Sequence, residues 1–321
     1  MIIIWNYYIA YFVLSQVKLF IGCDFMKQKI FTGAATALIT PMNDDYSVNF
    51  EKLELLVDQQ IKNGIDALVI CGTTGEKSTL NYKEHVEVIK RAAAACNKRV
   101  PIIAGAGSND TTYTVGLCNE AIDCGADALL LVTPYYNKTS QKGLVTHYNY
   151  IADRVNKPII LYNVPSRTGV NIFPETYKEL SYHENIVATK EANGDISSVA
   201  LTRKLCGDNL EIYSGNDDQI IPILSLGGSG VISVLSNILP YETHKMCDDY
   251  LSGNTTAASK SQIYYASLIK ALFSDVNPIP VKEAMNMLGY GVGPCRMPLV
   301  EMSDNLREKL KEELLNCGCF K

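Results

Sequence analysis

The segment NKPIILYNVPSRTG, residues 156–169, is followed further along the chain by NIVATKEANG, residues 185–194. Each begins as an apolar run and ends in polar residues and a glycine. Near-continuous apolar runs of this length are typical of parallel strands that are covered by helices. The two segments therefore predict strands over 158–164 and 186–192, with polar side chains at their carboxyl ends.

Six further apolar runs bounded by turn residues repeat this pattern. They cover residues 34–41, 65–71, 100–106, 126–133, 211–214 and 230–235. Helical patterns lie between them: Phe50, Leu53 and Val57 share one face of a predicted helix, and a second helix is predicted over 82–96. Eight βα units with right-handed crossovers predict an α/β fold, a (β/α)8 TIM barrel over residues 26–252.

The rival architecture is a doubly wound open sheet. It is disfavoured because no predicted strand leads into G-x-G-x-x-G, and the glycine cluster at 227–230 leads into a strand instead of a helix. After the barrel, a C-terminal region over 253–321 is expected to add three helices, which are predicted over 263–273, 281–288 and 304–316.

Residues 1–25 differ from the rest of the chain, because 19 of the 25 are hydrophobic and they contain the only tryptophan, Trp5. A window this apolar is long enough to span a bilayer, so a membrane anchor is one interpretation. The segment lacks the basic start and the cleavage signal of a secretory leader. We favour Met26 as the true start, because a complete barrel strand begins a few residues after it.

Composition excludes several classes of function. The 321 residues carry 29 Lys+Arg and 34 Asp+Glu, a net charge of -5, which argues against nucleic acid or an anionic membrane as a partner. The ten cysteines contain no C-x-x-C and lie mostly in apolar runs, as expected of buried thiols in a reducing cytoplasm. The four histidines form no H-x-x-x-H pair, so no metal site is expected.

Function in a TIM barrel is expected at the carboxyl ends of the strands. Lys190 lies inside an apolar strand and shares one face with the small Ala188 and Ala192. A buried lysine gives up its proton more readily, and the free amine is the form that attacks a carbonyl to make a Schiff base. The alternative is an outward lysine that pairs with Glu191 or another acid. The pattern alone leaves both interpretations open.

Four more residues at strand ends could act on the same ligand. Tyr162 could shuttle a proton, or it could be a half-buried aromatic with a satisfied hydroxyl. Thr73 and Thr74 could hold a small carboxylate, or they could belong to a capped turn. Arg167 could bind a second carboxylate through its bidentate fork, or it could form an ordinary surface ion pair.

The strand-end motifs are more specific in combination than singly. They are G-T-T-G-E at 72–76, P-Y-Y-N at 134–137, Y-N-V-P-S-R-T-G at 162–169, T-K-E-A at 189–192, S-G-N-D at 214–217 and G-V-I-S-V at 230–234. In this order, from about Phe31 to the C-terminus, the chain resembles the dihydrodipicolinate synthase family of pyruvate-dependent class I aldolases. The resemblance implies a Schiff-base condensation of pyruvate with L-aspartate 4-semialdehyde and ring closure, in lysine and diaminopimelate biosynthesis, without a cofactor.

The resemblance also implies roles for eight residues. Lys190 matches the lysine that forms the imine, and Tyr162 matches the proton donor and acceptor. Thr73 matches the next member of the proton relay, and Tyr136 matches a residue that reaches into the neighbouring subunit's site. Thr74 matches the contact to the carboxylate of pyruvate, and Arg167 matches the clamp on the semialdehyde's carboxylate. Gly215 and Ile232 match backbone contacts near pyruvate and the lysine. A homodimer is the smallest active unit implied, and a dimer of dimers is the family's usual form.

Two alternatives remain beside this function. N-acetylneuraminate lyase and the keto-sugar-acid aldolases use the same lysine and tyrosine, but they lack Thr73-Thr74 in combination with the residues at 166–169. A barrel that only senses pyruvate or an amino acid is the non-enzymatic alternative, and it would be expected to lose Lys190 or Tyr162.

Feedback inhibition is a separate expectation. In lysine-inhibited members of the family, an effector pocket at the dimer interface uses positions that match Lys77, Ser78, Tyr82, His85, Asn109, Tyr113 and Tyr135. Here Lys77 brings a cation to a pocket for a cationic effector, and Tyr113 stands where those members have an acid. We expect little inhibition by lysine.

Overall fold

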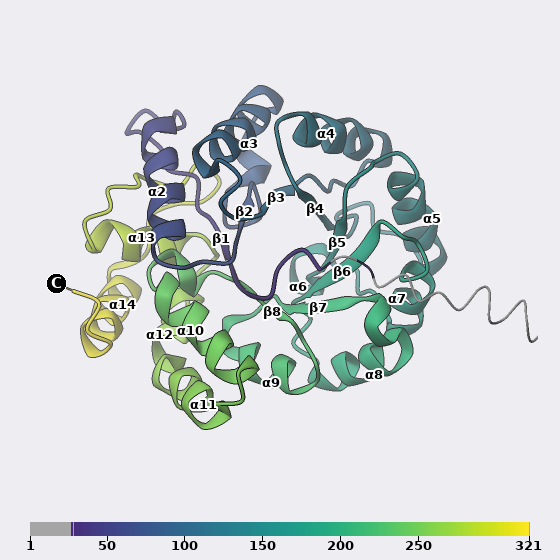
Figure 1. Cartoon of the computed structure of the whole chain (residues 1–321). Coiled ribbons are helices and arrows are strands. Elements are labelled where there is room, and N and C mark those ends of the chain that lie inside the picture. The colour runs from purple at the N-terminus through teal and green to yellow at the C-terminus, as the bar shows by residue number, and fades with distance from the viewer. Residues whose placement is uncertain (1–26, 28, 321) are drawn as a thin grey trace, which may run out of the picture.

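Eight short parallel strands close into a barrel in the order in which they occur in the chain, as Figure 1 shows. The strands are β1 (Gly33–Ala37), β2 (Ala67–Ile70), β3 (Ile102–Gly105), β4 (Ala128–Val132), β5 (Ile159–Asn163), β6 (Ile186–Glu191), β7 (Glu211–Ser214) and β8 (Gly230–Ser233). This confirms the predicted TIM barrel. The computed structural model describes residues 27 and 29–320, so the expectations for residues 1–25 lie outside the described part of the chain.

A ring of helices covers the outside of the barrel (Figure 1). It consists of α2 (Phe50–Lys62), α3 (Tyr82–Cys96), α4 (Thr111–Asp123), α5 (Gln141–Ala152), α7 (Pro174–Leu180), α8 (Ile196–Cys206), α9 (Ile220–Ser225) and α10 (Pro240–Leu251), while the short α6 (Pro165–Thr168) follows β5. The predicted helix over 82–96 begins where expected because Asn81 and Glu84 form a capping box.

Buried side chains form two layers that the strands separate. The outer layer packs the strands against the helices, with large residues such as Leu68, Ile70 and Leu129. The inner layer fills the barrel and includes the small residues Ala35 and Ala188. Strand alternation produces this division, because successive side chains point to opposite faces.

Four helices follow the barrel, namely α11 (Thr255–Tyr264), α12 (Ala266–Leu272), α13 (Ile279–Met287) and α14 (Asp304–Asn316). The single helix predicted over 263–273 is wrong, since α11 and α12 meet at Tyr265. The sequence pattern missed the start of α11 because this helix is largely polar and buries only Ala258. Within residues 27 and 29–320, none of the helices has the length and apolar character needed to cross a membrane.

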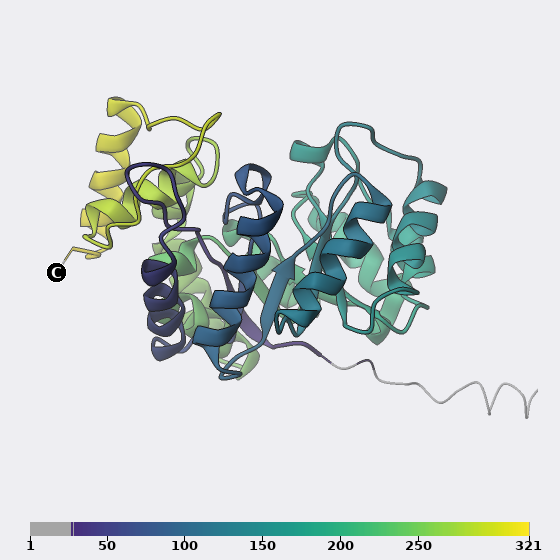
Figure 2. The same ribbon diagram turned by 90° about the horizontal axis from the view of Figure 1, so that it is seen from above.

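The C-terminal helices lie at the end of the barrel toward which β1 runs, as Figures 1 and 2 show together. A buried ion pair fixes α13 there: Lys282 Nζ lies 2.8 Å from Glu76 Oε1, and it also donates to the carbonyl oxygen of Thr40 at 3.2 Å. Glu76 belongs to the loop after β2. The helical extension is therefore attached directly to a loop at the carboxyl ends of the strands.

Candidate active site

Lys190 and Tyr162 face each other inside the barrel. They are register partners on β6 and β5, and the Lys190 Nζ atom lies 4.5 Å from the centre of the Tyr162 ring. Both side chains are buried, with 5% and 7% of their surface exposed. Lys190 forms no ion pair with any residue in the described part of the chain. An amine and a phenol hydroxyl thus share one enclosed site.

Glu191 points to the opposite face of β6, so the interpretation that it pairs with Lys190 is wrong. Its carboxylate accepts hydrogen bonds from Asn163 Nδ2 at 3.0 and 3.1 Å and from the Tyr177 hydroxyl at 2.8 Å. The backbone N–H of Asn193 also donates to it, at 2.9 Å. Burial raises the pKa of Glu191 to about 7, and these donors oppose that shift.

Two further predicted residues line the same interior. Ile232 on β8 is fully buried and belongs to the inner layer together with Tyr162 and Ala188. Gly215 follows β7, and its N–H donates to the carbonyl oxygen of Glu191 at 2.7 Å. A Cβ atom at Gly215 would lie 2.7 Å from the Cβ atom of Ala192, so only glycine fits against the end of β6.

The loop after β2 supplies the predicted threonines. Thr74 is buried, whereas Thr73 is partly exposed. The loop is bracketed by two non-glycine residues with left-handed backbone, Cys71 (φ 56) and Glu76 (φ 53). Such strained conformations cost about 1 to 3 kcal/mol each and cluster at binding sites. The Lys282–Glu76 ion pair attaches the second of these two residues to α13.

Asn277 connects Thr74 to Arg167, and the strand-end pattern did not reveal it. Its side-chain amide donates to Thr74 Oγ1 at 3.0 Å, and its carbonyl oxygen accepts from Arg167 Nη2 at 3.2 Å. Arg167 is otherwise exposed on α6. Asn277 lies two residues before α13, outside the barrel strands, and the Asn277-Pro278 dipeptide that marks a turn was the only signal in the sequence.

Tyr136 lies apart from this cluster. It follows β4 with left-handed backbone (φ 68), and 92% of its surface is exposed. A bulky aromatic residue at a positive φ is a genuine outlier. Within one chain, the structure therefore does not bring Tyr136 to Lys190.

Four of the positions predicted for an effector lie in or just before the first turn of α3, and Tyr113 reaches Tyr82 from α4. The rings of Tyr82 and Tyr113 meet edge to face, with centroids 6.1 Å apart. His85 is buried, with Nε2 lying 3.0 Å from the carbonyl oxygen of Gly105, and burial together with Lys77 lowers its pKa to about 4. Burial also lowers the pKa of Lys77, to about 8. A lysine amine thus sits beside a neutral histidine here.

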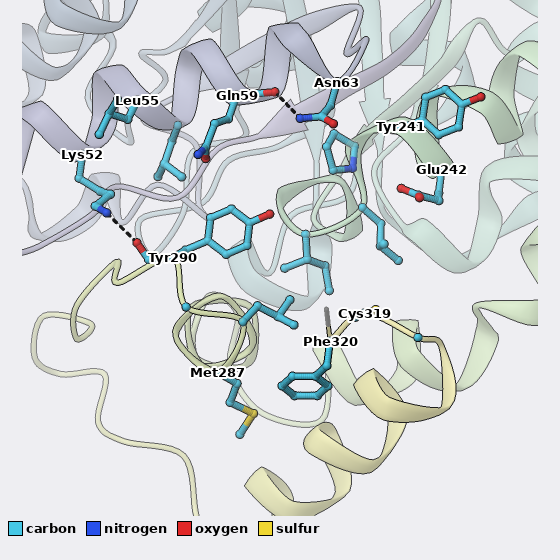
Figure 3. Close-up of a pocket in the computed structure, with 17 residues that line it drawn as sticks. Lys52, Leu55, Gln59, Asn63, Tyr241, Glu242, Met287, Tyr290, Cys319 and Phe320 are labelled. Atoms are coloured by element: carbon cyan, nitrogen blue, oxygen red, sulfur yellow. Dashed lines mark hydrogen bonds between the residues drawn. The ribbon is translucent and has the colours of Figure 1, made fainter.

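A cavity of about 790 Å³ lies elsewhere, on the outside of the barrel (Figure 3). Its walls come from α2, α10, the end of α13 and the tail after α14, and Lys52 Nζ crosses one edge to donate to the carbonyl oxygen of Tyr290 at 2.8 Å. None of the eight predicted site residues lines it. The candidate active site is the barrel interior, not this cavity.

The chain is similar to known proteins over most of its length. The sequence profile of the "Dihydrodipicolinate synthetase family" matches residues 30–316. A 4-hydroxy-tetrahydrodipicolinate synthase of Clostridium perfringens is 53% identical over 91% of this chain and 100% of its own, and one of Caldicellulosiruptor saccharolyticus is 55% identical over 90% and 98%. A crystal structure of dihydrodipicolinate synthase from Acinetobacter baumannii, complexed with pyruvate, is 40% identical, covers 91% of this chain and 100% of its own, and superposes with a TM-score of 0.89.

Proposed function

The chain belongs to the dihydrodipicolinate synthetase family and catalyses the reaction of a 4-hydroxy-tetrahydrodipicolinate synthase, and we propose that Lys190 carries that reaction. The substrates are pyruvate and L-aspartate 4-semialdehyde, and the product enters lysine biosynthesis. The observation that supports the role of Lys190 is its burial beside Tyr162 without an acidic partner among the described residues.

In the proposed mechanism, the free amine of Lys190 attacks C2 of pyruvate and forms a carbinolamine. Loss of water from the carbinolamine gives the imine, and loss of a proton from C3 gives the enamine. The enamine carbon then forms the new bond to the aldehyde carbon of the second substrate, whose oxygen takes up a proton. Finally the substrate's own amino group attacks C2, which closes the ring and releases the lysine amine.

Tyr162 is the proposed proton donor and acceptor of these steps. A general acid or base must reach the reacting atoms, and the Tyr162 ring is packed against the nucleophile. Thr73 would pass protons onward from Tyr162. Tyr136 would complete the relay from a second copy of the chain, which fits its almost complete exposure in the single chain.

Two carboxylates have to be held while the chain's amine reacts. Thr74 is the proposed contact for the carboxylate of pyruvate, and Arg167 is the proposed clamp for that of the semialdehyde. Gly215 and Ile232 would contribute backbone contacts near pyruvate and Lys190. All four lie at the carboxyl ends of strands or in the loops that follow them, where TIM-barrel sites form.

Borohydride reduction in the presence of pyruvate tests this assignment. The imine would be reduced to a stable adduct, and peptide mapping should find it on Lys190. The variant Lys190→Ala should give no adduct, while Lys142→Ala, which changes an exposed lysine, should label like the wild type. An adduct elsewhere, or none in the wild type, would contradict the proposed role.

The second substrate separates this function from that of the related lyases. With pyruvate present, the wild type should consume L-aspartate 4-semialdehyde and leave N-acetylmannosamine unchanged. Faster turnover of N-acetylmannosamine would support the N-acetylneuraminate lyase alternative. A reducible adduct without turnover of either compound would support a sensor instead of an enzyme.

We further propose a cytoplasmic homo-oligomer in which pairs of chains share sites. Tyr136 supports this proposal, because an exposed tyrosine on strained backbone has no role in its own chain's barrel. Mixing inactive Tyr136→Ala and Lys190→Ala chains should restore activity, since a mixed dimer contains one intact site. No gain on mixing would contradict a shared site.

We also propose that lysine inhibits this enzyme only weakly. Lys77 lies next to His85, where its amine would repel a cationic effector, and Tyr113 stands at a position where lysine-inhibited members have an acid. Lysine should therefore leave the initial rate unchanged up to about millimolar concentrations, which corresponds to roughly 4 kcal/mol of binding energy. Half-inhibition well below that concentration would contradict the proposal.

A further inference from the structure

Asn277 belongs to the C-terminal extension, yet it contacts both groups to which the substrate carboxylates are assigned. We propose that Asn277 is a positioning residue that aims the Thr74 hydroxyl at the carboxylate of pyruvate and thereby sets the KM for pyruvate. This inference rests on the proposed function, because it acts through Thr74. With this role, the binding site includes a residue from outside the eight strand–helix units.

The direction of the hydrogen bond carries the first step. A threonine hydroxyl has one proton to donate and two lone pairs to accept with. The Asn277 amide donates to Thr74 Oγ1 at 3.0 Å, so it occupies a lone pair and leaves the Thr74 proton free. No other side-chain hydrogen bond of Thr74 occurs within the described residues. A carboxylate has only acceptors, and the freed proton is the group that it needs.

The second step is the rigidity of this contact. Asn277 is buried, and the helix that it precedes, α13, is held to the Thr74 loop a second time by the Lys282–Glu76 ion pair at 2.8 Å. Its carbonyl oxygen also accepts from Arg167 Nη2 at 3.2 Å. The segment 277–282 therefore touches the loop after β2 at two points and the loop after β5 at one.

The third step is that Asn277 is poorly explained as a residue kept for stability. Its Oδ1 atom is buried and has no hydrogen-bond partner within the part of the chain that the structure describes. A buried polar atom without a partner costs free energy, and proteins usually avoid it. The contact of Nδ2 with Thr74 is the one hydrogen bond that the Asn277 side chain makes among the described residues, which points to Thr74 as the partner that this side chain serves.

Steady-state kinetics on the full-length protein test the proposal. Asn277→Ala should raise the KM for pyruvate about tenfold, the factor expected when one buried hydrogen bond is lost, with kcat changed much less. Asn277→Asp is nearly isosteric and should raise KM as well, because its carboxylate accepts the Thr74 proton and repels pyruvate. The KM for the semialdehyde should change less, since the carbonyl that holds Arg167 remains.

The matched control is Asn286→Ala, on the helix α13 that follows Asn277. Asn286 is exposed and makes two hydrogen bonds, to the carbonyl oxygen of Gly293 and from the N–H of Val292, away from the site. This variant should keep the KM of the wild type. If it raises the KM for pyruvate as much as Asn277→Ala does, general loosening of α13 explains the effect and the proposal is overturned.

A double-mutant cycle separates a direct role from an indirect one. In a Thr74→Val background, Asn277→Ala should add little to the KM for pyruvate. A full additional increase there, or an unchanged KM in the single variant, would overturn the proposal. Borohydride labelling of Lys190 at saturating pyruvate should survive in Asn277→Ala. If Lys190 of the wild type is not labelled either, the proposed function itself is refuted.

Discussion

The two faces of β6 carry a basic and an acidic side chain that do not contact each other. On the inner face, Lys190 lies against the ring of Tyr162 and has no acidic partner among the described residues. On the outer face, the adjacent Glu191 is held by Asn163 and Tyr177 and has no cationic partner there. Successive side chains on a strand point in opposite directions, so neighbours in sequence lie in separate layers of the core.

The two faces of β6 accommodate their buried ionisable groups in different ways. A buried charge is normally paired or neutralised, and here each face uses a different solution. On the inner face, the amine has no acidic partner among the described residues, as its proposed bond to a substrate requires. The outer face surrounds the carboxylate with hydrogen-bond donors from β5, α7 and the loop after β6, which fixes the strand on which the amine is mounted. The proposed nucleophile and the side chain that supports its strand thus lie on opposite faces of β6.

The largest effect is expected from removing the amine on the inner face. Lys190→Ala should lower kcat by roughly 10^4-fold or more, because the covalent intermediate is lost. Glu191→Gln, which removes the outer charge, should lower kcat by less than about tenfold, since it changes support and not the nucleophile. Turnover of pyruvate and semialdehyde measures both. Comparable losses in the two variants would show that the faces do not differ in role.

The two tyrosines offer a matched test of intermediate size. Tyr162→Phe should lower kcat about 100-fold, the scale of a lost general acid, with little change in the free energy of unfolding. Tyr177→Phe removes the donor to Glu191 and should lower the free energy of unfolding by about 2 kcal/mol, with kcat nearly unchanged.

Rate assays and urea unfolding on both tyrosine variants check this reversal. A large loss of kcat in Tyr177→Phe would contradict it, as would a large loss of stability in Tyr162→Phe. The fold of each variant is verified by its secondary-structure spectrum before the comparison is made.

The inner face could be predicted from sequence, because it depends on local alternation. Apolar runs set the strands, and the period of two assigned Lys190, Ala188 and Ala192 to one side. The order of strand-end motifs then predicted the remaining residues, of which Tyr136 would act only from a second chain. Short-range pattern and closed topology were sufficient for this part.

The contacts on the outer face and the contact from the extension to the site could not be predicted in this way. Tyr177 reaches Glu191 from a helix of the preceding βα unit, and Asn277 reaches Thr74 across 203 positions of sequence. Neither contact leaves a periodic signal, because each depends on how a helix is docked. The one local pattern available for Glu191, its position next to Lys190, suggested an ion pair that strand geometry forbids.

The most specific prediction is the pH dependence that Glu191 gives to stability. Its pKa is raised to about 7 in the folded chain, above the ordinary value near 4.5 that it regains on unfolding. Between these values the folded state binds the proton more tightly, so this group's contribution to stability falls as pH rises from about 4.5 to about 7. Buried His85 and His147, with pKa values lowered to about 4, act in the opposite direction.

The histidines are common to the wild type and Glu191→Gln, so their contributions cancel in the difference between the two proteins. That difference should shift by about 2 to 3 kcal/mol in favour of the glutamine variant between about pH 5 and about pH 8. Urea unfolding at equal protein concentration measures it. A difference that stays constant with pH would mean that the Glu191 carboxylate is as easily ionised in the folded chain as in water. The outer face would then be an ordinary solvated contact, and the contrast between the two faces of β6 would lose its physical basis.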